Sequence, residues 1–318
     1  MFNIRPFQKN DAEYDAIAAV EKAVFPDNPE TVEDFKYSDQ TRNPNLMYHR
    51  LVVVHDGQIV GFAIYAQQSV SGRYHFYITV HPDFERRGVG TAVYNHILNA
   101  ITPLTPAPEM LGTGCYEHKP QSIQFLQKRE FKQVMRWVIS TLDVATFDDT
   151  PFASLAAKIA DQGIDIMPLS TLKTIDPTWQ NQLYELDWLL TLDEPQPYLP
   201  KKPEFAQYVK REIENPNLLH DAWFVARENG RYVGMTQLTK SDDLTTYKTG
   251  FTGTVRSHRR RGLATLLKTN AIHYAKQSGI RTIRTGNEEN NPMYALNLKL
   301  GFKDLTANLA FEKVIDGR

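Results

Sequence analysis

A basic stretch in the second half of the chain, RRRGLATLLK, has the residue types and spacing best suited to chemistry. Arg259, Arg260 and Arg261 precede Gly262, and an apolar helical pattern begins at Leu263. The glycine leaves the main chain bare at the point where a helix starts. Amide N–H groups at a helix N-terminus bind phosphate, helped by the helix dipole, and guanidinium groups add forked donors. The stretch therefore predicts a cradle for a pyrophosphate.

Positive charge surrounds this turn, although the chain as a whole is almost neutral. The net charge is −1, from 36 basic and 37 acidic side chains, and no Asp or Glu occurs between Leu244 and Asn287. A local positive field of this kind steers an anion. Near-neutrality and the absence of interleaved aromatic residues argue against nucleic acid as a partner. The basic residues of the interval are Lys248, Arg256, Arg259, Arg260, Arg261, Lys268, Lys276, Arg281 and Arg284.

Length and composition predict a folded protein of two domains. The chain has 318 residues, of which 42% are hydrophobic and 23% charged. Its single cysteine, Cys115, cannot form an internal disulfide, and a reducing, cytoplasmic setting is expected. The start, MFNIRPFQKND, lacks the apolar core of a signal peptide. No apolar run reaches the roughly 18 residues of a membrane span, so no membrane partner is expected.

Three segments recur in the same order, which indicates a duplicated domain. RLVVVHDGQIVGFAIYAQ resembles AWFVARENGRYVGMTQLTK, ITVHPDFERRGVGTAVYNHIL resembles GTVRSHRRRGLATLLKTNAI, and FLQKREF resembles LNLKLGF. Each copy is long enough to bury a core of its own. The separations are 173 residues for Gly57 and Gly230, 174 for Gly88 and Gly262, and 171 for Phe131 and Phe302.

Each copy is predicted to have the same layout. A short strand (3–7 or 164–169) is followed by a helical region, a β-hairpin, a further strand and the glycine turn into a helix. In the second copy a strand over 281–285, a short helix around Tyr294 and a last strand complete the pattern. The fold class is α/β (α+β) with helices on the sheet. The predicted domains are 1–149 and 164–318, joined by a linker helix within 150–163.

The glycine turn resembles a known signature. RRRGLA matches the Arg/Gln-x-x-Gly-x-Gly/Ala motif of the GNAT superfamily of N-acetyltransferases, and NNPMYALNLKLGF resembles the Asn-x-x-Met … Asn-x-x-Leu-Gly-Phe segment of that superfamily. The duplicated layout is similar to tandem bacterial members, among them relatives of mycothiol synthase. The resemblance implies a mixed, mostly antiparallel sheet in each domain. It also implies acetyl-CoA as co-substrate, no metal, and acetyl transfer by direct attack of a primary amine, from a small molecule or peptide, on the thioester.

The resemblance assigns acetyl-CoA contacts mainly to the second copy. In the first copy Glu85 stands where the signature has Arg or Gln, and a carboxylate repels a pyrophosphate. We therefore expect the second copy to hold the working site, while Arg87, Gly88 and Gly90 keep a weaker one. The expected contact residues of the second copy are Thr254, Val255, Arg259, Arg260, Arg261, Gly262, Leu263, Ala264, Thr265 and Asn290.

The catalytic groups are less clear than the turn. Many relatives use a tyrosine to protonate the leaving thiolate, and Asn297 stands at that position, with Tyr294 one helical turn earlier. Tyr294 also fits a role in core packing. Asp193 and Glu194 are candidates to bind or deprotonate the amine, although solvated surface acids fit them equally well. Other candidates near them are Glu185 and Asp187 as acids and Trp179, Trp188, Tyr198 and Phe205 as pocket walls or core.

Two other functions stay open from the sequence. The missing tyrosine and the lack of an obvious base permit an acyl-CoA-binding or sensing protein without turnover. Duplicated domains of this type also occur in aminoacyl transferases that use charged tRNA, which near-neutral charge argues against. The nine histidines show no metal spacing, and His258 is expected to be exposed. The acceptor amine and the oligomeric state are not predicted.

Overall fold

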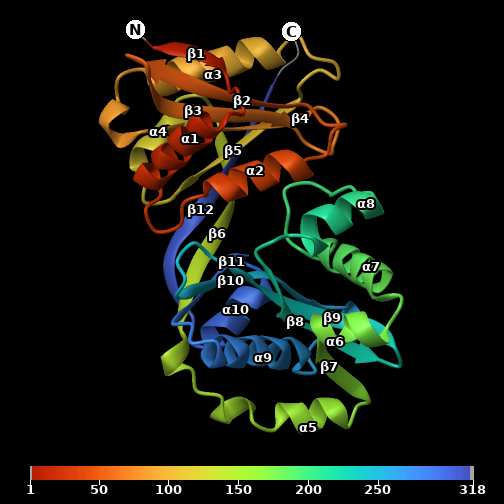
Figure 1. The fold of residues 1–318 in the computed structure, drawn as a ribbon. Coiled ribbons are helices and arrows are strands. Elements are labelled where there is room, and N and C mark those ends of the chain that lie inside the picture. Colours follow the sequence, from red (N-terminus) through yellow and green to blue (C-terminus); the bar gives the residue numbers. More distant parts are fainter. Residues whose placement is uncertain (1, 316–318) are drawn as a thin grey trace. The chain divides into compact units, whose positions relative to one another are not determined.

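Two compact units make up the protein, whose computed structural model describes residues 2–315 (Figure 1). Unit 1 comprises the chain up to Met135 and the chain from Leu309 onward, and unit 2 comprises Arg136–Asn308. Both cuts fall inside strands, namely β6 (Lys132–Asp143) and β12 (Lys303–Val314). The units therefore differ at their ends from the ranges 1–149 and 164–318, because β6 and β12 each contribute to both.

Unit 1 is a sheet with helices packed against it. The strands β1, β2, β3 and β4 pair antiparallel in chain order, and β5 pairs parallel with β4. The end of β12 lies beside β5 and adds Leu309 and Phe311 to the core of this unit. The elements are β1 (Asn3–Pro6), α1 (Asp11–Val24), α2 (Val32–Thr41), β2 (Tyr48–His55), β3 (Gln58–Gln67), β4 (Arg73–Val80), η1 (Pro82–Phe84), α3 (Val89–Ile101), β5 (Met110–Tyr116) and α4 (Pro120–Gln127).

Unit 2 repeats this arrangement. The strands β7 to β10 pair antiparallel in chain order, β11 pairs parallel with β10, and β6 pairs antiparallel with β11. The elements are η2 (Val144–Thr146), η3 (Thr150–Phe152), α5 (Leu155–Ala160), β7 (Ile164–Pro168), α6 (Leu169–Ile175), α7 (Trp179–Thr191), α8 (Phe205–Tyr208), the π-helical turn η4 (Val209–Ile213), β8 (Leu218–Glu228), β9 (Arg231–Lys240), β10 (Thr246–Thr254), η5 (Arg256–His258), α9 (Leu263–Gln277), β11 (Thr282–Glu288) and α10 (Pro292–Lys299).

The predicted hairpins and fold class are confirmed. Both hairpin turns have two successive residues with positive φ, Asp56 and Gly57 in unit 1 and Asn229 and Gly230 in unit 2. That geometry is the type I′ turn which Asp-Gly and Asn-Gly favour. Each unit has a mixed, mostly antiparallel sheet, as the sequence predicted. Among residues 2–315, no helix combines the length and apolar character of a membrane span.

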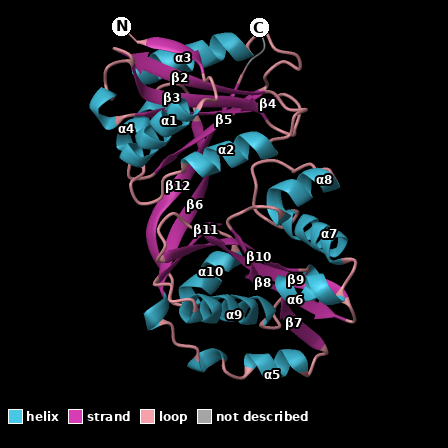
Figure 2. Ribbon diagram, in the orientation of Figure 1, coloured by secondary structure: helices cyan, strands magenta, loops and turns pink. Residues whose placement is uncertain are grey.

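Helices cover both faces of the sheet of unit 2 (Figure 2). Leu183, Leu186 and Leu190 recur at helical spacing on α7 and pack with Trp223 and Met235 on one face. On the other face, α9 packs against β8, β9 and β10. Helical spacing predicted an apolar stripe of Leu263, Leu266, Leu267, Ala271 and Tyr274; the first four are buried, and Tyr274 is half-buried.

The two parallel strands of each unit separate after three residue pairs. In unit 2, β10 and β11 pair from Thr246 with Thr282 to Lys248 with Arg284. Beyond Lys248, β10 continues beside β9 with a bulge, while β11 continues beside β6. One edge of the C-terminal half of β10 therefore lacks a strand partner, and this edge leads directly to the glycine turn. The corresponding strands of unit 1, β4 and β5, also pair over only three residues.

Candidate functional site

The glycine turn of unit 2 has the backbone that an anion site needs. Arg260 has φ of 62°, and Gly262 is the N-cap of α9 with φ of 86° and ψ of 0°. No side chain caps this helix start, so the first amide groups of α9 lack a side-chain acceptor. The turn follows β10, whose C-terminal half has the unpartnered edge. The residues therefore fit the pyrophosphate cradle that the sequence predicted, and the role of each remains a prediction.

Asp193 binds two arginines at the edge of this turn. Its carboxylate accepts a hydrogen bond from Arg256 Nε at 2.8 Å and another from Arg259 Nη2. The hydrogen bond from Arg256 lowers the pKa of Asp193, and burial opposes this shift. A carboxylate with a lowered pKa is a weak base. This geometry suits Asp193 to positioning the two guanidinium groups better than to taking a proton from an amine.

The linker helix α5 covers one side of the turn. A Cβ atom added at Gly262 would lie 2.8 Å from Leu155 Cδ2. Arg261 Nε donates to Gln162 Oε1 at 2.6 Å, just after the end of α5. Arg261 also lies 3.7 Å from Glu228. The segment predicted as a connector thus contributes contacts to the turn itself.

Two residues of the basic stretch, His258 and Lys268, are buried, although basic side chains are usually exposed. His258 was expected to be exposed, but it is 7% exposed, and its Nε2 lies 3.2 Å from Glu228. Lys268 is 3% exposed, lies over the ring of Phe302, and has a pKa that burial lowers to about 8. The helical period explains this, because Lys268 lies three, four and seven residues before the buried Ala271, Ile272 and Ala275. The positive field at the turn therefore comes chiefly from the arginines.

The corresponding turn of unit 1 has the same backbone but an open surface. Arg86 has φ of 62°, and Gly88 caps α3 with φ of 84° and ψ of −2°. A Cβ atom at Gly88 would meet nothing within 4 Å. Glu85 and Arg87 are exposed, and the Arg87 guanidinium lies 5.1 Å from the centroid of the Phe84 ring. The turn is accessible, but an acid stands where unit 2 has Arg259.

Asn297 lies buried on α10 with a free acceptor. It is 1% exposed, and its Nδ2 donates to Asn287 Oδ1 at 2.5 Å. Its own Oδ1 has no hydrogen-bond partner among the described residues. Tyr294, one turn earlier, is elsewhere: its exposed hydroxyl donates to Asp304 at 2.7 Å, and this hydrogen bond raises its pKa. The structure does not bring Asn297 and Tyr294 to one point.

Asn290 and Asn291 make different hydrogen bonds. Asn291 is the N-cap of α10 and accepts a hydrogen bond from Met293 N at 2.9 Å. Asn290 instead donates through N at 2.9 Å and Nδ2 at 2.8 Å to Glu288. Glu288 ends β11 and is only 6% exposed. Sequence reasoning missed Glu288, because an acid at the end of a largely polar strand carries no local signal.

Two further buried polar groups on the α7 side of the sheet were missed. Trp223 on β8 lies opposite Gln237 on β9, and neither Trp223 Nε1 nor Gln237 Oε1 has a hydrogen-bond partner among the described residues. Gln237 packs closely on Gly250, next to the bulge of β10. An unpartnered donor and acceptor beside the bulge suit contacts to a polar ligand.

A small cavity lies between α7 and the α8–η4 segment. Its volume is about 140 Å³. Glu194, a predicted candidate, follows α7 and has a pKa that burial raises. Glu185, by contrast, binds Lys202 at 2.7 Å on an exposed surface. The cavity is lined by Tyr184, Asp187, Trp188, Thr191, Pro200, Lys201, Pro203, Gln207, Tyr208, Arg211 and Glu212.

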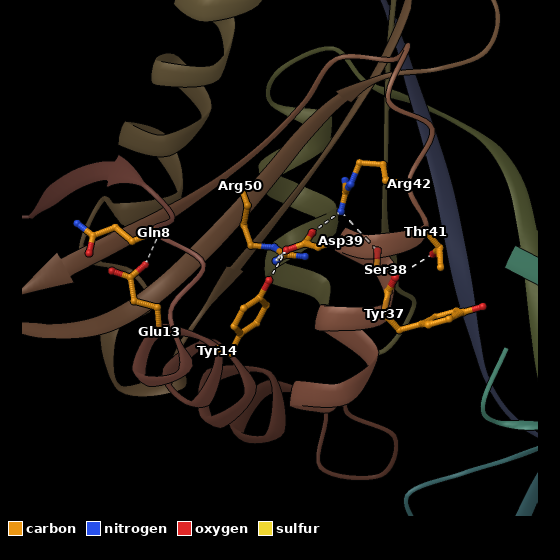
Figure 3. Close-up of polar contacts among 9 residues, drawn as sticks. All are labelled: Gln8, Glu13, Tyr14, Tyr37, Ser38, Asp39, Thr41, Arg42 and Arg50. Carbon is orange, nitrogen blue, oxygen red and sulfur yellow. Dashed lines mark hydrogen bonds and ion pairs between the residues drawn. The ribbon is translucent and has the colours of Figure 1, made fainter. Parts of the chain in front are cut away.

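Unit 1 has a buried ionic cluster in its corresponding corner (Figure 3). The carboxylate of Asp39 on α2 accepts from Tyr14 Oη at 2.7 Å, Arg42 Nη2 at 2.6 Å and Arg50 Nη1 at 2.8 Å. The side chains of Asp39 and Arg50 are 6% and 4% exposed. The cluster joins α2 to α1 and β2, and two arginines of the same unit neutralise the Asp39 carboxylate.

Among residues 2–315 no group of three His, Cys, Asp or Glu side chains is placed to hold a metal ion. Cys115 is half-buried, and burial raises the pKa of its thiol to about 11. A thiol with a raised pKa is a poor nucleophile.

Comparisons with known proteins support the duplicated layout. The model of the acetyltransferase (GNAT) family matches residues 14–131 and again residues 181–302. No curated protein sequence matches the chain significantly. A solved tandem GNAT protein from the clavulanic acid biosynthesis pathway is similar with a TM-score of 0.74 and 19% identity, over 99% of this chain and 98% of that one. A GCN5-related N-acetyltransferase from Sphaerobacter thermophilus gives 0.69 and 15%, over 98% and 95%.

Proposed function

We propose a function from the premise that this chain belongs to the acetyltransferase (GNAT) family, whose model matches both halves of it. The proposed function is acetyl-CoA-dependent transfer of an acetyl group to a primary amine of a small molecule or peptide, in unit 2. The observation that carries the proposal is the uncapped start of α9 behind the left-handed Gly262, with Arg259 and Arg261 beside it. Uncovered amide groups and guanidinium groups together recognise a pyrophosphate.

The proposed acetyl transfer does not require a residue that donates a proton to the leaving thiolate. The nitrogen of a neutral amine attacks the thioester carbonyl, a C–N bond forms, the C–S bond breaks, and its electron pair leaves with sulfur. The amine proton passes to solvent. Since an unperturbed thiol has a pKa of about 8.5, its thiolate is a tolerable leaving group without a proton donor. Amide groups on the unpartnered edge of β10 would polarise the carbonyl. Asn297, which cannot donate a proton as an acid, would contribute a hydrogen bond.

The test is release of free CoA thiol by the purified full chain. Acetyl-CoA is supplied with a panel of amines, and acetylated product is identified by mass. We expect thiol release that depends on an amine and on Arg259. Thermal stabilisation by acetyl-CoA with no release for any amine would contradict acetyl transfer while preserving cofactor binding.

One observation favours a second function, an acyl-CoA-binding protein without turnover. The Tyr294 hydroxyl donates to Asp304, and Asn297, which is buried, replaces the tyrosine that many relatives use. Under this alternative, acetyl-CoA binds to unit 2 and dissociates unchanged. Mass analysis of the CoA pool after long incubation with the amine panel separates the two functions.

The location of the protein, its co-substrate and its partner are proposed from the same family membership. A reducing, cytoplasmic location agrees with the single, half-buried Cys115 and remains a proposal. Acetyl-CoA would be a co-substrate, and no metal takes part in the proposed step. The acceptor amine is the partner that the proposal requires, whereas nucleic acid is not needed.

A further inference from the structure

A row of four half-buried polar side chains crosses the sheet of unit 2. The strands β9, β10, β11 and β6 lie side by side in this sheet (Figure 1). Lys248 on β10 lies opposite Thr239 on β9 and Arg284 on β11. Arg284 in turn lies opposite Thr141 on β6. Two cations therefore lie next to each other, with a threonine hydroxyl on either side.

The row lies on the face of the sheet opposite to α9. Tyr247 and Ile283 directly precede the two cations in the sequence, and they pack in the core to which Ala271 of α9 belongs. Successive side chains of a strand point to opposite faces, so both cations lie on the other face. This is the face that α7 covers farther along, over β8 and β9. The sheet itself therefore separates the two cations from the helix that follows the glycine turn.

Lys248 and Arg284 have no acidic partner. Among residues 2–315, neither side chain forms an ion pair or a side-chain hydrogen bond. Their own strands supply no acid nearby, since no Asp or Glu occurs between Leu244 and Asn287. Like charges on directly opposite residues destabilise a sheet. An oxyanion bound between the two cations would replace this repulsion by charge-assisted hydrogen bonds.

Gly286 leaves an open space beside Arg284. It lies two residues farther along β11, on the same face, and it is exposed. Among the described residues, a Cβ atom added at Gly286 would have Val138 O, at 4.0 Å, as its only neighbour within that distance. The main chain next to the guanidinium is therefore bare, and a small ligand has room to approach both cations.

Two acids on the same face favour a ligand group with a single negative charge. Asp143 ends β6, two residues after the row, and Glu288 ends β11, four residues after it. Each accepts a hydrogen bond from a main-chain N–H of the turn that follows, of Ala145 and of Asn290 respectively. These two carboxylates repel a doubly charged phosphate more strongly than a singly charged carboxylate. The charges around the row therefore suit a carboxylate.

We propose that Lys248 and Arg284 bind the carboxylate of a small organic acid on this face of unit 2. The guanidinium of Arg284 offers two parallel N–H donors to the two carboxylate oxygens, and the ammonium of Lys248 adds a point charge. The body of the acid lies over the bare main chain at Gly286. The inference concerns binding alone and holds without acetyl transfer. If the proposed function is also correct, the site selects an acceptor that carries a carboxylate, and this last step alone rests on the proposed function.

The experiment is calorimetric titration of the full chain, without acetyl-CoA, at about pH 7 and about 0.15 M salt, where carboxylates are ionised and distant charges are screened. The probe is butanoate, and the matched neutral ligand is butanamide. We expect butanoate to bind at least about tenfold more tightly than butanamide, as one charge-assisted hydrogen bond predicts. Equal binding of butanamide, or no binding of butanoate at roughly 10 mM, overturns the proposal.

Variants locate the binding. Lys248→Gln and Arg284→Gln should each weaken butanoate about tenfold, and Arg284→Lys, which keeps the charge but loses the fork, about threefold. Each Gln variant removes one of two repelling charges, so the fold should tolerate it, and thermal unfolding checks this. The matched control is Lys276→Gln, an exposed base in the last turn of α9, which should leave the affinity unchanged.

Two results of the variant series would overturn the assignment. Butanoate affinity that both Gln variants at the row leave unchanged would place the anion elsewhere. An equal loss in Lys276→Gln would reduce the effect to unspecific attraction by positive charge. Inorganic phosphate is titrated in parallel, and phosphate that binds more tightly than butanoate and loses its affinity in Lys248→Gln would refute the preference for a carboxylate.

Discussion

The two glycine turns share one backbone and differ in almost everything around it. Gly88 and Gly262 cap their helices with nearly equal dihedral angles, φ of 84° and 86°. The turn of unit 1 is exposed and begins with Glu85. The turn of unit 2 begins with Arg259, which Asp193 holds, and α5 covers one side of it. Duplication thus preserved a main-chain geometry while the side chains that give it a ligand diverged.

This difference teaches that backbone alone does not identify the working copy. Amide groups at both helix starts are available to an anion. What separates the copies is the sign of the first side chain and the number of side-chain contacts around the turn. Unit 1 is more open, whereas unit 2 has the charge that a pyrophosphate needs.

The largest expected effect comes from disabling the turn of unit 2. Arg259→Glu combined with Gly262→Asp places two acids at the proposed pyrophosphate cradle. Losing two charge-assisted contacts lowers kcat/KM by about a thousandfold. CoA release with a responsive amine measures this, and circular dichroism confirms folding.

Gly88→Asp is the matched change in unit 1 and should alter kcat/KM less than about twofold. A comparable loss from Gly88→Asp would move the working site to unit 1.

A gain of binding in unit 1 is the second prediction. In the background that disables unit 2, Glu85→Arg restores the signature at the first turn. We expect the affinity for acetyl-CoA to rise at least about tenfold, since a repulsive acid becomes a charge-assisted donor. Calorimetry measures the affinity, and Glu85→Gln should give an intermediate value. If neither variant gains affinity, then something other than Glu85 keeps unit 1 inactive.

The third prediction compares the space around the two glycines. Alanine at either position costs about 1 kcal/mol, because φ is positive there. At Gly262 the new Cβ also meets Leu155, which adds about 1–2 kcal/mol of overpacking. Urea unfolding measures both, with tryptophan fluorescence reporting unit 2, which contains all four tryptophans, and far-UV circular dichroism following both units. In a Leu155→Ala background the extra cost should vanish. Equal costs for Gly88→Ala and Gly262→Ala in the native background would show that α5 yields freely.

Local signals explain what the sequence could predict of the fold. Asn-Gly and Asp-Gly turns, helical spacing after Gly262 and the internal repeat all act over a few residues or over one period. The division of β6 and β12 between the units could not be predicted, because strand partners distant in sequence leave no local pattern. The early separation of β10 from β11 was hidden for the same reason.

The site was predictable to the same depth. The turn could be predicted because its three arginines and Gly262 are adjacent in the sequence. The contact of Asp193 with Arg256 and Arg259 was not, since it requires the end of α7 to fold back onto the turn. In the sequence, nothing distinguishes Glu288 and Tyr208 from other acids and tyrosines, because only the fold shows that they are buried.

The smallest predicted effect is a pH dependence confined to the turn of unit 2. The folded-state pKa of Asp193 is lowered, chiefly by its hydrogen bond from Arg256. A lowered pKa adds stability above the unfolded pKa of about 3.9, and this stability is lost as pH falls through the folded value. Asp193→Asn should therefore cost about 0.5–1 kcal/mol at neutral pH and nothing in strong acid.

Denaturant unfolding of wild type and Asp193→Asn between about pH 7 and pH 3 measures this difference. The magnitude is small because Arg256 and Arg259 keep 77% and 45% of their side-chain surface exposed, so water competes for them. Glu85→Gln is the counterpart at the turn of unit 1, where the acid is exposed, and its difference from wild type should stay near zero throughout. A difference for Asp193→Asn that persists unchanged in acid would mean that its packing, and not the ion pair, holds the two arginines. The contrast between the turns would then rest on Arg259 alone.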